Sequence, residues 1–216
     1  MRIVEPDFDR MTRCGIPEIV YGEGKTERQL TEIALHLLKN SGRVIATKVS
    51  KEKAKAVISK AKGVKSSYDE LSGVLVLKKR TFKVEKSGGS IGIITAGTSD
   101  VAVAEEARII LEELGRSTVT SYDIGVAGVH RVYPALKRME DVKVIIVAAG
   151  MEGALPSVVG GLVDVPVIGV PTSVGYGVGR GGHAALNSML TSCAPVAVVN
   201  IDNGYGAAVL AYQMTK

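Results

Sequence analysis

The chain has 216 residues, a net charge of +5 and 46% hydrophobic residues, with no tryptophan. This length allows one large domain, or a standard domain beside a small one. No apolar run approaches the roughly 20 residues that span a bilayer, the amino terminus lacks the apolar core of a signal peptide, and two cysteines give no disulfide framework. We therefore expect a soluble, cytoplasmic protein without a membrane partner.

The basic excess lies early in the chain, between residues 48 and 80. Aromatic residues are sparse there, so the lysines indicate a solvated surface, and we expect no nucleic-acid partner. The amino-acid composition changes near residues 86–90: the sequence before them is rich in lysine, and the sequence after them is rich in glycine, alanine and valine. This change predicts a small amino-terminal α/β subdomain, residues 1–87, and a larger domain, residues 88–216.

The first part predicts alternating helices and strands. Residues 27–39 carry Leu30, Ile33, Ala34 and Leu37 at the spacing of one buried helical face. The other predicted elements are a strand at 43–49, a helix at 51–62 capped by Ser50, and a strand at 73–77.

The second part predicts five short apolar strands separated by helices. The strands are expected at residues 90–95, 117–121, 142–147, 165–170 and 196–201, and the helices near 100–114, 128–139, 155–162, 183–191 and 206–213. This alternation indicates a parallel sheet with right-handed crossovers, whose ligands bind beyond the carboxyl ends of the strands. The apolar residues 207–212 of the last helix are consistent with a buried subunit contact.

Three of the loops after these strands carry polar or charged side chains. In the loop at residues 96–100, Thr98 or Ser99 can cap the following helix while backbone N–H groups face an anion. Glu152, among small residues at a strand end, suits a cation or a proton transfer, or is a solvated glutamate. His130 is either a core histidine or, with Arg131 beside it, a contact for phosphate or carboxylate.

The fourth loop is a glycine-rich run, residues 175–182, which lets a backbone approach an anionic ligand. Gly177, Gly179 and Gly182, with Asp202 further on, also match a dinucleotide fingerprint. That match is imperfect because residues 171–176 separate the predicted strand from the first glycine. A nicotinamide-dependent dehydrogenase and a non-catalytic nucleotide-binding protein stay open as alternatives.

The two cysteines have different sequence surroundings. Cys193 follows the helix that the glycine-rich run opens, and precedes a strand that exits to Asp202. It is either an inert small hydrophobe or a nucleophile. Cys14 has no comparable setting, and we interpret it as structural.

Several of these segments together resemble two related families. Residues 96–100, 128–131, 148–156 and 166–171 resemble the active-site segments of the aminoimidazole ribonucleotide carboxylase family, PurE. Residues 15–26, 46–48, 175–182, 187–195 and 199–208 resemble the LarB family of nickel-pincer cofactor biosynthesis, whose carboxyl-terminal half is PurE-like. One departure separates the two: PurE proteins carry a histidine before Leu-Pro, where this chain has Ala154.

The resemblance implies a fold and an activity. The fold is α/β, a PurE-like parallel sheet with flanking helices in a Rossmann- or flavodoxin-like three-layer arrangement. The activity is carboxylation by CO2 of C5 of the pyridinium ring of nicotinic acid adenine dinucleotide, with hydrolysis of the phosphoanhydride. The products are pyridinium-3,5-biscarboxylate mononucleotide and AMP. Neither ATP nor biotin is required, and a homo-oligomer, an octamer, is expected. An aminoimidazole ribonucleotide carboxylase or mutase is the alternative.

The resemblance also implies roles for individual residues. A thiolate of Cys193 adds to the ring at C4 or C6 and makes C5 nucleophilic. Glu152 binds Mg²⁺ or accepts a proton. His130 and Asp100 are expected to be further catalytic residues. The expected substrate-binding residues are Thr98, Ser99, Arg131, Gly177, Gly179, Gly181, Asn200 and Asp202.

Overall fold

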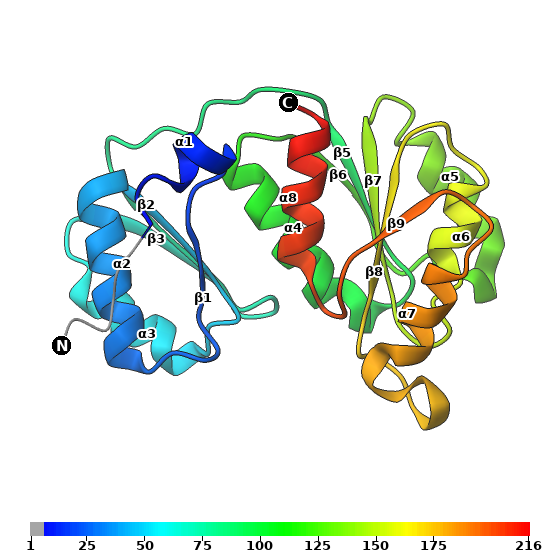
Figure 1. The fold of residues 1–216 in the computed structure, drawn as a ribbon, viewed down its shortest axis with the longest axis horizontal. Coiled ribbons are helices and arrows are strands. Elements are labelled where there is room, and N and C mark those ends of the chain that lie inside the picture. The colour runs from blue at the N-terminus through cyan, green and yellow to red at the C-terminus, as the bar shows by residue number, and fades with distance from the viewer. Residues whose placement is uncertain (1–6) are drawn as a thin grey trace. The chain divides into compact units, whose positions relative to one another are not determined.

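The computed structural model describes residues 7–216. The first six residues lie outside it, and they include most of the amino terminus in which the sequence shows no apolar signal-peptide core. The chain divides into two compact units, of which the first ends at Val84 and the second comprises Glu85–Lys216. Each unit has its own sheet (Figure 1). Within residues 7–216, no helix has the length and apolarity needed to cross a membrane.

The first unit is a four-stranded mixed sheet in the order β1-β2-β4-β3, with two longer helices on one face (Figure 1). Strands β1 and β2 are parallel, and β4 is antiparallel to both of its neighbours. Its elements are α1 (Arg10–Cys14), β1 (Ile19–Tyr21), α2 (Glu27–Ser41), β2 (Arg43–Thr47), α3 (Lys51–Lys60), β3 (Val64–Asp69) and β4 (Val74–Lys79).

Local signals fix the two longer helices of this unit, α2 and α3. Thr26 and Gln29 form a reciprocal capping box at the start of α2, and Gly42 ends it in the left-handed conformation. Ser50 accepts a hydrogen bond from the Lys53 N–H and caps α3, as the sequence predicts. The apolar face of α2 and the inner residues of β2 and β4 form one buried cluster.

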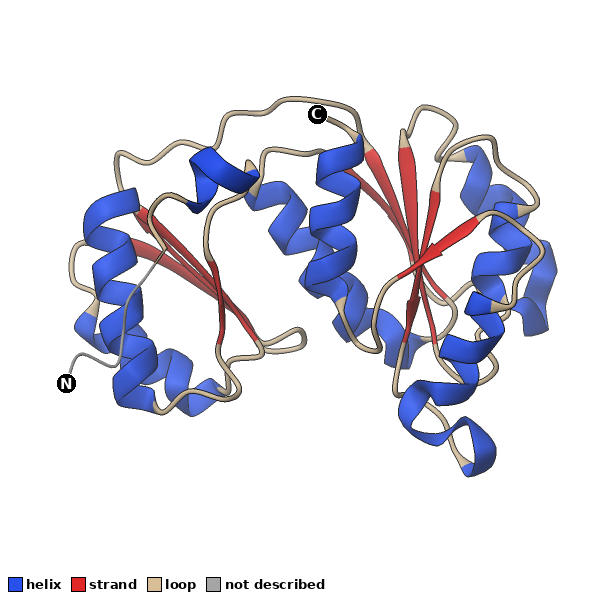
Figure 2. Cartoon of the chain, viewed as in Figure 1, coloured by secondary structure: helices blue, strands red, loops and turns tan. Residues whose placement is uncertain are grey.

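The second unit is a five-stranded, fully parallel sheet in the order β6-β5-β7-β8-β9. Helices α4 and α8 cover one face, and α5, α6 and α7 cover the other (Figure 2). The α/β fold with flanking helices is thereby confirmed. Its strands are β5 (Ile91–Thr95), β6 (Thr118–Ser121), β7 (Val144–Ala149), β8 (Val167–Pro171) and β9 (Val196–Val198). Its helices are η1 (Thr98–Asp100), α4 (Val101–Glu113), η2 (Val126–Arg131), α5 (Val132–Lys137), α6 (Leu155–Gly160), η3 (Gly177–Gly182), α7 (His183–Leu190) and α8 (Gly204–Met214).

The strand order positions the site. From β5 the chain crosses to β6 on one side and then returns to β7 on the other side of β5. Such a reversal is a topological switch point, where the loops after the two central strands diverge and leave a crevice. Both central strands are buried along their whole length, so they hold these loops rigidly.

The last helix is covered by its own chain on one face only. Its small apolar residues Ala207, Ala208 and Ala211 are fully buried within the second unit, where α8 packs on α4. Val209 and Leu210 of the same segment are half-buried, so the subunit contact that the sequence suggested stays a prediction.

Candidate active site

A cavity of about 380 Å³ opens at the switch point of the parallel sheet. The loops after β5, β6 and β7 supply most of its walls, and the segment after β8 supplies Val174. The polar or charged side chains that line it belong to Thr98, Ser99, Asp100, Asp123 and Glu152. The carboxyl ends of the strands are therefore the place where this chain can hold a small ligand.

Asp100 organises the loop after β5. Its carboxyl group is 3% exposed, accepts a 2.6 Å hydrogen bond from the Thr172 hydroxyl and accepts another, of 2.8 Å, from the Gly97 N–H. Burial raises the pKa of Asp100, while the hydrogen bonds from Thr172, Gly97 and Gly150 oppose that rise. Asp100 is thus a buried positioning group that joins the loops after β5, β7 and β8.

The predicted capping by Thr98 or Ser99 is wrong. Neither the 3-10 helix η1 nor α4 has a hydroxyl cap. The side-chain bond at this turn is instead the one that the Asp100 carboxylate accepts from the Gly97 N–H. The Thr98 and Ser99 side chains are exposed and line the cavity, where they are available to a ligand.

Two glycines allow the site loops to pack closely. A methyl group at Gly150 would lie 2.3 Å from the Val174 carbonyl oxygen and 2.6 Å from Thr172 Oγ1. At Gly125 it would lie 2.7 Å from the Ala96 carbonyl oxygen. Any larger residue would push these loops apart, so the cavity walls depend on both glycines.

Glu152 lies in the loop after β7, exposed and facing the cavity. Residues 7–216 contain no group of three His, Cys, Asp or Glu side chains placed to hold a metal ion. A metal bound by protein ligands alone does not fit this site. A cation held by one carboxylate together with phosphate oxygens of a ligand does fit, and Mg²⁺ is commonly bound in that way.

His130 and Arg131 lie at the end of η2, and both are exposed, which excludes the core-histidine interpretation. Arg131 donates to the backbone oxygen of Asp123 at 2.5 Å and lies 3.4 Å from its carboxylate. Asp123 lines the cavity, whereas His130 and Arg131 do not. Arg131 is therefore a neighbour of the cavity rim, and the structure does not bring His130 into the cavity.

The glycine loop, which we define as residues 175–182, lies at the same edge of the sheet. A methyl group at Gly179 would lie 3.4 Å from the Met151 oxygen, so the loop packs against the loop after β7. Gly177 and Gly181 adopt left-handed backbone conformations with open space around them. Strand β8 ends at Pro171 and residues 172–176 intervene, so the glycines do not form the tight strand-to-helix turn of a dinucleotide fingerprint.

Asn200 and Asp202 follow β9 and lie near this loop. The side-chain Oδ1 of Asn200 accepts from the Ile201 N–H at 2.9 Å. Asp202 accepts from the Ser173 N–H at 2.9 Å, which ties the segment after β9 to the segment after β8. Neither side chain lines the cavity, so here they support the loops around it.

Cys193 lies away from all these groups. Its thiol is exposed in the loop between α7 and β9, which enters β9 at its amino end. Helix α7, of 8 residues, starts at the glycine loop and spans about 12 Å along its axis. The structure therefore does not bring Cys193 and Glu152 together within one chain, although the sequence suggested a shared site.

Sequence reasoning missed Thr172 and Asp123. Thr172 is fully buried directly after β8, and Asp123 follows β6 in a left-handed conformation. A polar residue immediately after a buried strand is the signal that could have identified either one.

The comparisons with known proteins agree with this architecture. Residues 1–80 match the model of the LarB/PurE-like N-terminal domain, and residues 90–216 match that of AIR carboxylase. An uncharacterised protein of Methanocaldococcus jannaschii is 48% identical over 216 residues, covering 97% of this chain and 83% of the relative. The N5-carboxyaminoimidazole ribonucleotide mutase of Pyrococcus horikoshii is 37% identical over 138 residues, covering 57% of this chain and 71% of the mutase.

A solved structure is also similar. The crystal structure of a PurE2 variant of Treponema denticola matches 58% of this chain and 78% of its own, with 25% identity and a TM-score of 0.48. The AIR carboxylase model spans more than half of the chain. The chain therefore belongs to the AIR carboxylase family, and it carries a LarB/PurE-like N-terminal domain.

Proposed function

We propose that this protein carboxylates C5 of the pyridinium ring of nicotinic acid adenine dinucleotide with CO2 and hydrolyses its phosphoanhydride. The products are pyridinium-3,5-biscarboxylate mononucleotide and AMP. The LarB-type amino-terminal domain and the AIR carboxylase domain support this proposal, since together they account for nearly the whole chain.

The single observation that carries the proposal is the composition of the switch-point cavity. No histidine is among the residues that line it, and Ala154 lies at the start of α6. A purine carboxylase that moves protons with an imidazole needs a histidine in its site, and this cavity offers none among its lining residues. The activity must therefore use other side chains. Two exposed carboxylates line the cavity, and of these Asp123 lies beside Arg131, so Glu152 is our candidate.

The chemistry requires a nucleophile because a pyridinium C5 is electron-poor. The Cys193 thiolate adds at C4 or C6, a C–S bond forms, and the ring π electrons move onto nitrogen. The enamine C5 then attacks CO2 to form a C–C bond, and the CO2 oxygen takes the negative charge. Removal of the C5 proton by a base restores the enamine, and expulsion of the thiolate restores the aromatic ring. Glu152 is our candidate for that base.

We infer that this site is shared between copies of the chain. Cys193 lies at the amino end of β9, whereas the cavity lies at the carboxyl ends of β5 and β7. The thiol of one copy reaches a substrate in the cavity of a second copy if the amino edge of the first copy's sheet meets the carboxyl edge of the second copy's sheet. A homo-oligomer, an octamer by resemblance, follows from this arrangement.

The proposed hydrolysis involves Mg²⁺. Glu152 and substrate phosphate oxygens would hold it, and the bound ion would withdraw negative charge from the phosphoanhydride. Thr98 and Ser99, exposed beside Glu152 in the cavity, would donate hydrogen bonds to phosphate or carboxylate oxygens.

Mass spectrometry tests this function. The protein is incubated with nicotinic acid adenine dinucleotide, bicarbonate and Mg²⁺, and the products are AMP and a mononucleotide with one additional carboxylate. Cys193→Ala should abolish the carboxylated product, whereas Cys14→Ala, at an exposed thiol in the first unit, should not change it. Undiminished carboxylation by Cys193→Ala would exclude the thiolate mechanism.

A second candidate is the mutase activity that the relative from Pyrococcus horikoshii carries in its name. Its identity of 37% over 138 residues favours it. The histidine-free cavity counts against it. Incubation with N5-carboxyaminoimidazole ribonucleotide decides between them, because a mutase isomerises it while the proposed enzyme leaves it unchanged.

A further inference from the structure

One carboxylate of the switch-point cavity is not used by the proposed chemistry. Asp123, which follows β6, is exposed and lines the cavity together with Glu152, the candidate base. Its Oδ2 atom lies 3.4 Å from the Arg131 guanidinium. Its other oxygen, Oδ1, accepts no hydrogen bond within residues 7–216. An open carboxylate oxygen in a cavity wall is an acceptor for a ligand that can donate a hydrogen bond.

The backbone of Asp123 is held from both sides. Its N–H donates a 2.9 Å hydrogen bond to Thr95 Oγ1, and the N–H of Ile124 donates to the Thr95 carbonyl oxygen at 3.0 Å. Arg131 donates to the Asp123 carbonyl oxygen at 2.5 Å, and Gly128 leaves room for that guanidinium, since a methyl group there would lie 2.6 Å from Arg131 Nε. These contacts fix Asp123 in a left-handed conformation, with a φ of 57°, at a defined place in the cavity wall.

The chemistry of the proposed substrate limits what this carboxylate can bind. An ionised carboxylate only accepts hydrogen bonds. The phosphate and carboxylate groups of the dinucleotide are anionic, so they would repel it, and the ring nitrogen of the pyridinium has no proton to donate. In the nicotinate half of the dinucleotide, the hydrogen-bond donors are the hydroxyl groups of the ribose.

The position of the ring places this ribose near Asp123. Under the proposed function the pyridinium ring lies at Glu152, the base that removes its C5 proton. The ribose is bonded to the ring nitrogen, so it occupies the same cavity of about 380 Å³, which Asp123 also lines. The one donor group of this half of the substrate and the open acceptor of the cavity therefore share a small space.

We propose that Asp123 binds the 2′- and 3′-hydroxyls of the nicotinate ribose and selects a ribonucleotide over its 2′-deoxy counterpart. Oδ1 accepts from one hydroxyl, and Oδ2, whose contact with Arg131 is long at 3.4 Å, accepts from the other. Dinucleotide-binding α/β sheets use an acidic side chain on a ribose hydroxyl in a comparable role. This inference rests on the proposed function, because it takes the dinucleotide as the ligand.

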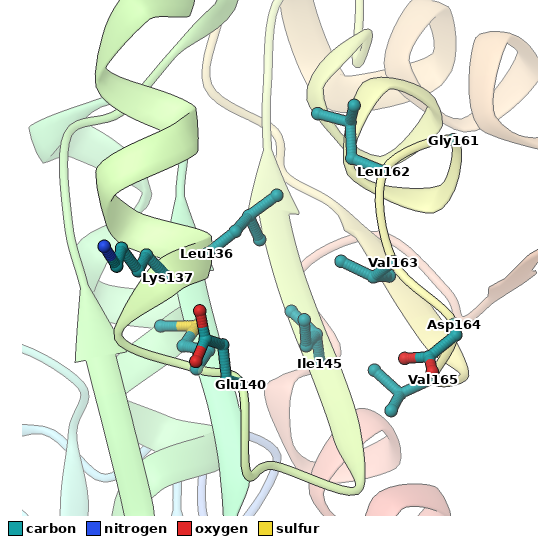
Figure 3. A pocket seen from close by; sticks show the side chains of 10 residues that line it. Leu136, Lys137, Glu140, Ile145, Gly161, Leu162, Val163, Asp164 and Val165 are labelled. Atoms are coloured by element: carbon teal, nitrogen blue, oxygen red, sulfur yellow. The ribbon is translucent and has the colours of Figure 1, made fainter.

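A second hollow in the same unit supplies a matched control. It has a volume of about 670 Å³ and lies near the amino ends of β7 and β8. Figure 3 shows the apolar side chains of Leu136, Ile145 and Val163 along it, with the Asp164 carboxylate at its rim. Asp164 is exposed and forms no ion pair within the part of the chain that the structure describes. Its removal eliminates one negative charge from the unit without changing the switch-point cavity.

Isothermal titration calorimetry tests the contact without turnover. All proteins carry Cys193→Ala, and bicarbonate and Mg²⁺ are left out, so that the ligand stays unreacted. The two ligands are nicotinic acid adenine dinucleotide and its analogue with 2′-deoxyribose in the nicotinate half. In the protein with Asp123 intact, the analogue should bind roughly 10- to 100-fold more weakly, because a hydrogen bond to a charged group is lost.

Removal of the acceptor should remove this difference. Asp123→Gly tolerates the left-handed backbone, and it should bind the two ligands within about threefold of each other, because glycine offers no side-chain acceptor. Asp123→Asn keeps the shape and replaces the charged acceptor by a neutral one, so its preference for the ribose ligand should fall between those of the other two proteins. Asp164→Gly should keep the full preference.

Three results would overturn the inference: no preference in the protein with Asp123 intact, an undiminished preference in Asp123→Gly, or equal weakening of both ligands by that variant. A merely structural role of Asp123 would produce the third. If the expected pattern holds while the mass-spectrometric assay detects no carboxylation, only the proposed function is wrong. A protein that binds neither ligand contradicts both proposals.

Discussion

The Thr172 hydroxyl donates a 2.6 Å hydrogen bond to Asp100 Oδ1, and both residues are almost fully buried. The two lie 72 positions apart, one directly after β8 and the other at the start of α4. This bond, with the one from Gly97, fixes the wall of the switch-point cavity that carries Thr98 and Ser99.

Thr172→Val should destabilise the fold by about 1–3 kcal/mol, because it leaves a buried carboxylate oxygen without its donor. Burial raises the pKa of Asp100 from 3.8. The folded state therefore favours the protonated carboxyl, and the stability that this contributes at low pH is lost as the pH rises through the raised pKa. The Thr172 bond lowers that pKa, and removing it raises the pKa further.

The pH dependence of the variant follows from this sign. The free energies of unfolding of wild type and Thr172→Val should differ least at a pH where the Asp100 carboxyl is protonated in both proteins. The difference should grow as the pH rises to 7. Urea unfolding at acid and neutral pH measures this, with Thr191→Val, at an exposed hydroxyl, as the control. An equal difference at both pH values would contradict the role of Asp100.

Gly150→Ala should lower the free energy of unfolding by about 1–3 kcal/mol, through overpacking against the backbone of Val174. Gly161→Ala is the matched control, because its methyl group would meet no atom closer than 3.6 Å and its backbone is helical. That variant should stay within about 0.5 kcal/mol of wild type. Thermal unfolding compares the three proteins, and equal losses in both variants would contradict the close approach.

Arg116 should be needed for the stability of the second unit. Only 4% exposed, it donates to the Ser87 oxygen at 2.6 Å and the Thr215 oxygen at 3.1 Å, and lies 4.3 Å from the Tyr212 ring centroid. Arg116→Met leaves both carbonyls without this donor, at a cost of about 1–3 kcal/mol each. Chemical unfolding measures the loss, and exposed Arg80→Met should leave stability unchanged.

A mixing experiment should show whether the thiol and the carboxylate act across copies. Cys193→Ala and Glu152→Gln should each be inactive alone. Mixed assemblies, formed by co-expression, should recover about a quarter of the wild-type turnover, since one contact in four joins an intact thiol to an intact cavity. No recovery in verified mixed assemblies would mean that both groups must come from one chain.

Much of the fold is predictable because its signals are local. The central strands β5 and β7 are continuous valine and isoleucine runs, and burial on both faces requires that composition. Strand β3 was missed because its residues, Val-Lys-Ser-Ser-Tyr-Asp, lie at a sheet edge and are mostly solvent-exposed. Helix α1 has no buried residue, so no apolar periodicity marks it.

The site was predictable in part. Ligands of parallel sheets bind beyond the carboxyl ends of the strands, and this rule predicts that the loops after β5 and β7 meet. The rule thereby identifies Thr98, Ser99, Asp100 and Glu152 as neighbours. Sequence spacing gave no information on which end of the sheet carries Cys193. Because the helix between the glycine loop and Cys193 runs antiparallel to the strands, residues close in sequence lie at opposite edges.

That antiparallel course of α7 has a consequence for the behaviour of the protein in dilute solution. Under the proposed function, an isolated chain carries both the Cys193 thiol and the Glu152 carboxylate but cannot bring them to one substrate molecule, so the total turnover should fall more steeply than the protein concentration once the copies separate. Protein abundance itself would then switch the enzyme on.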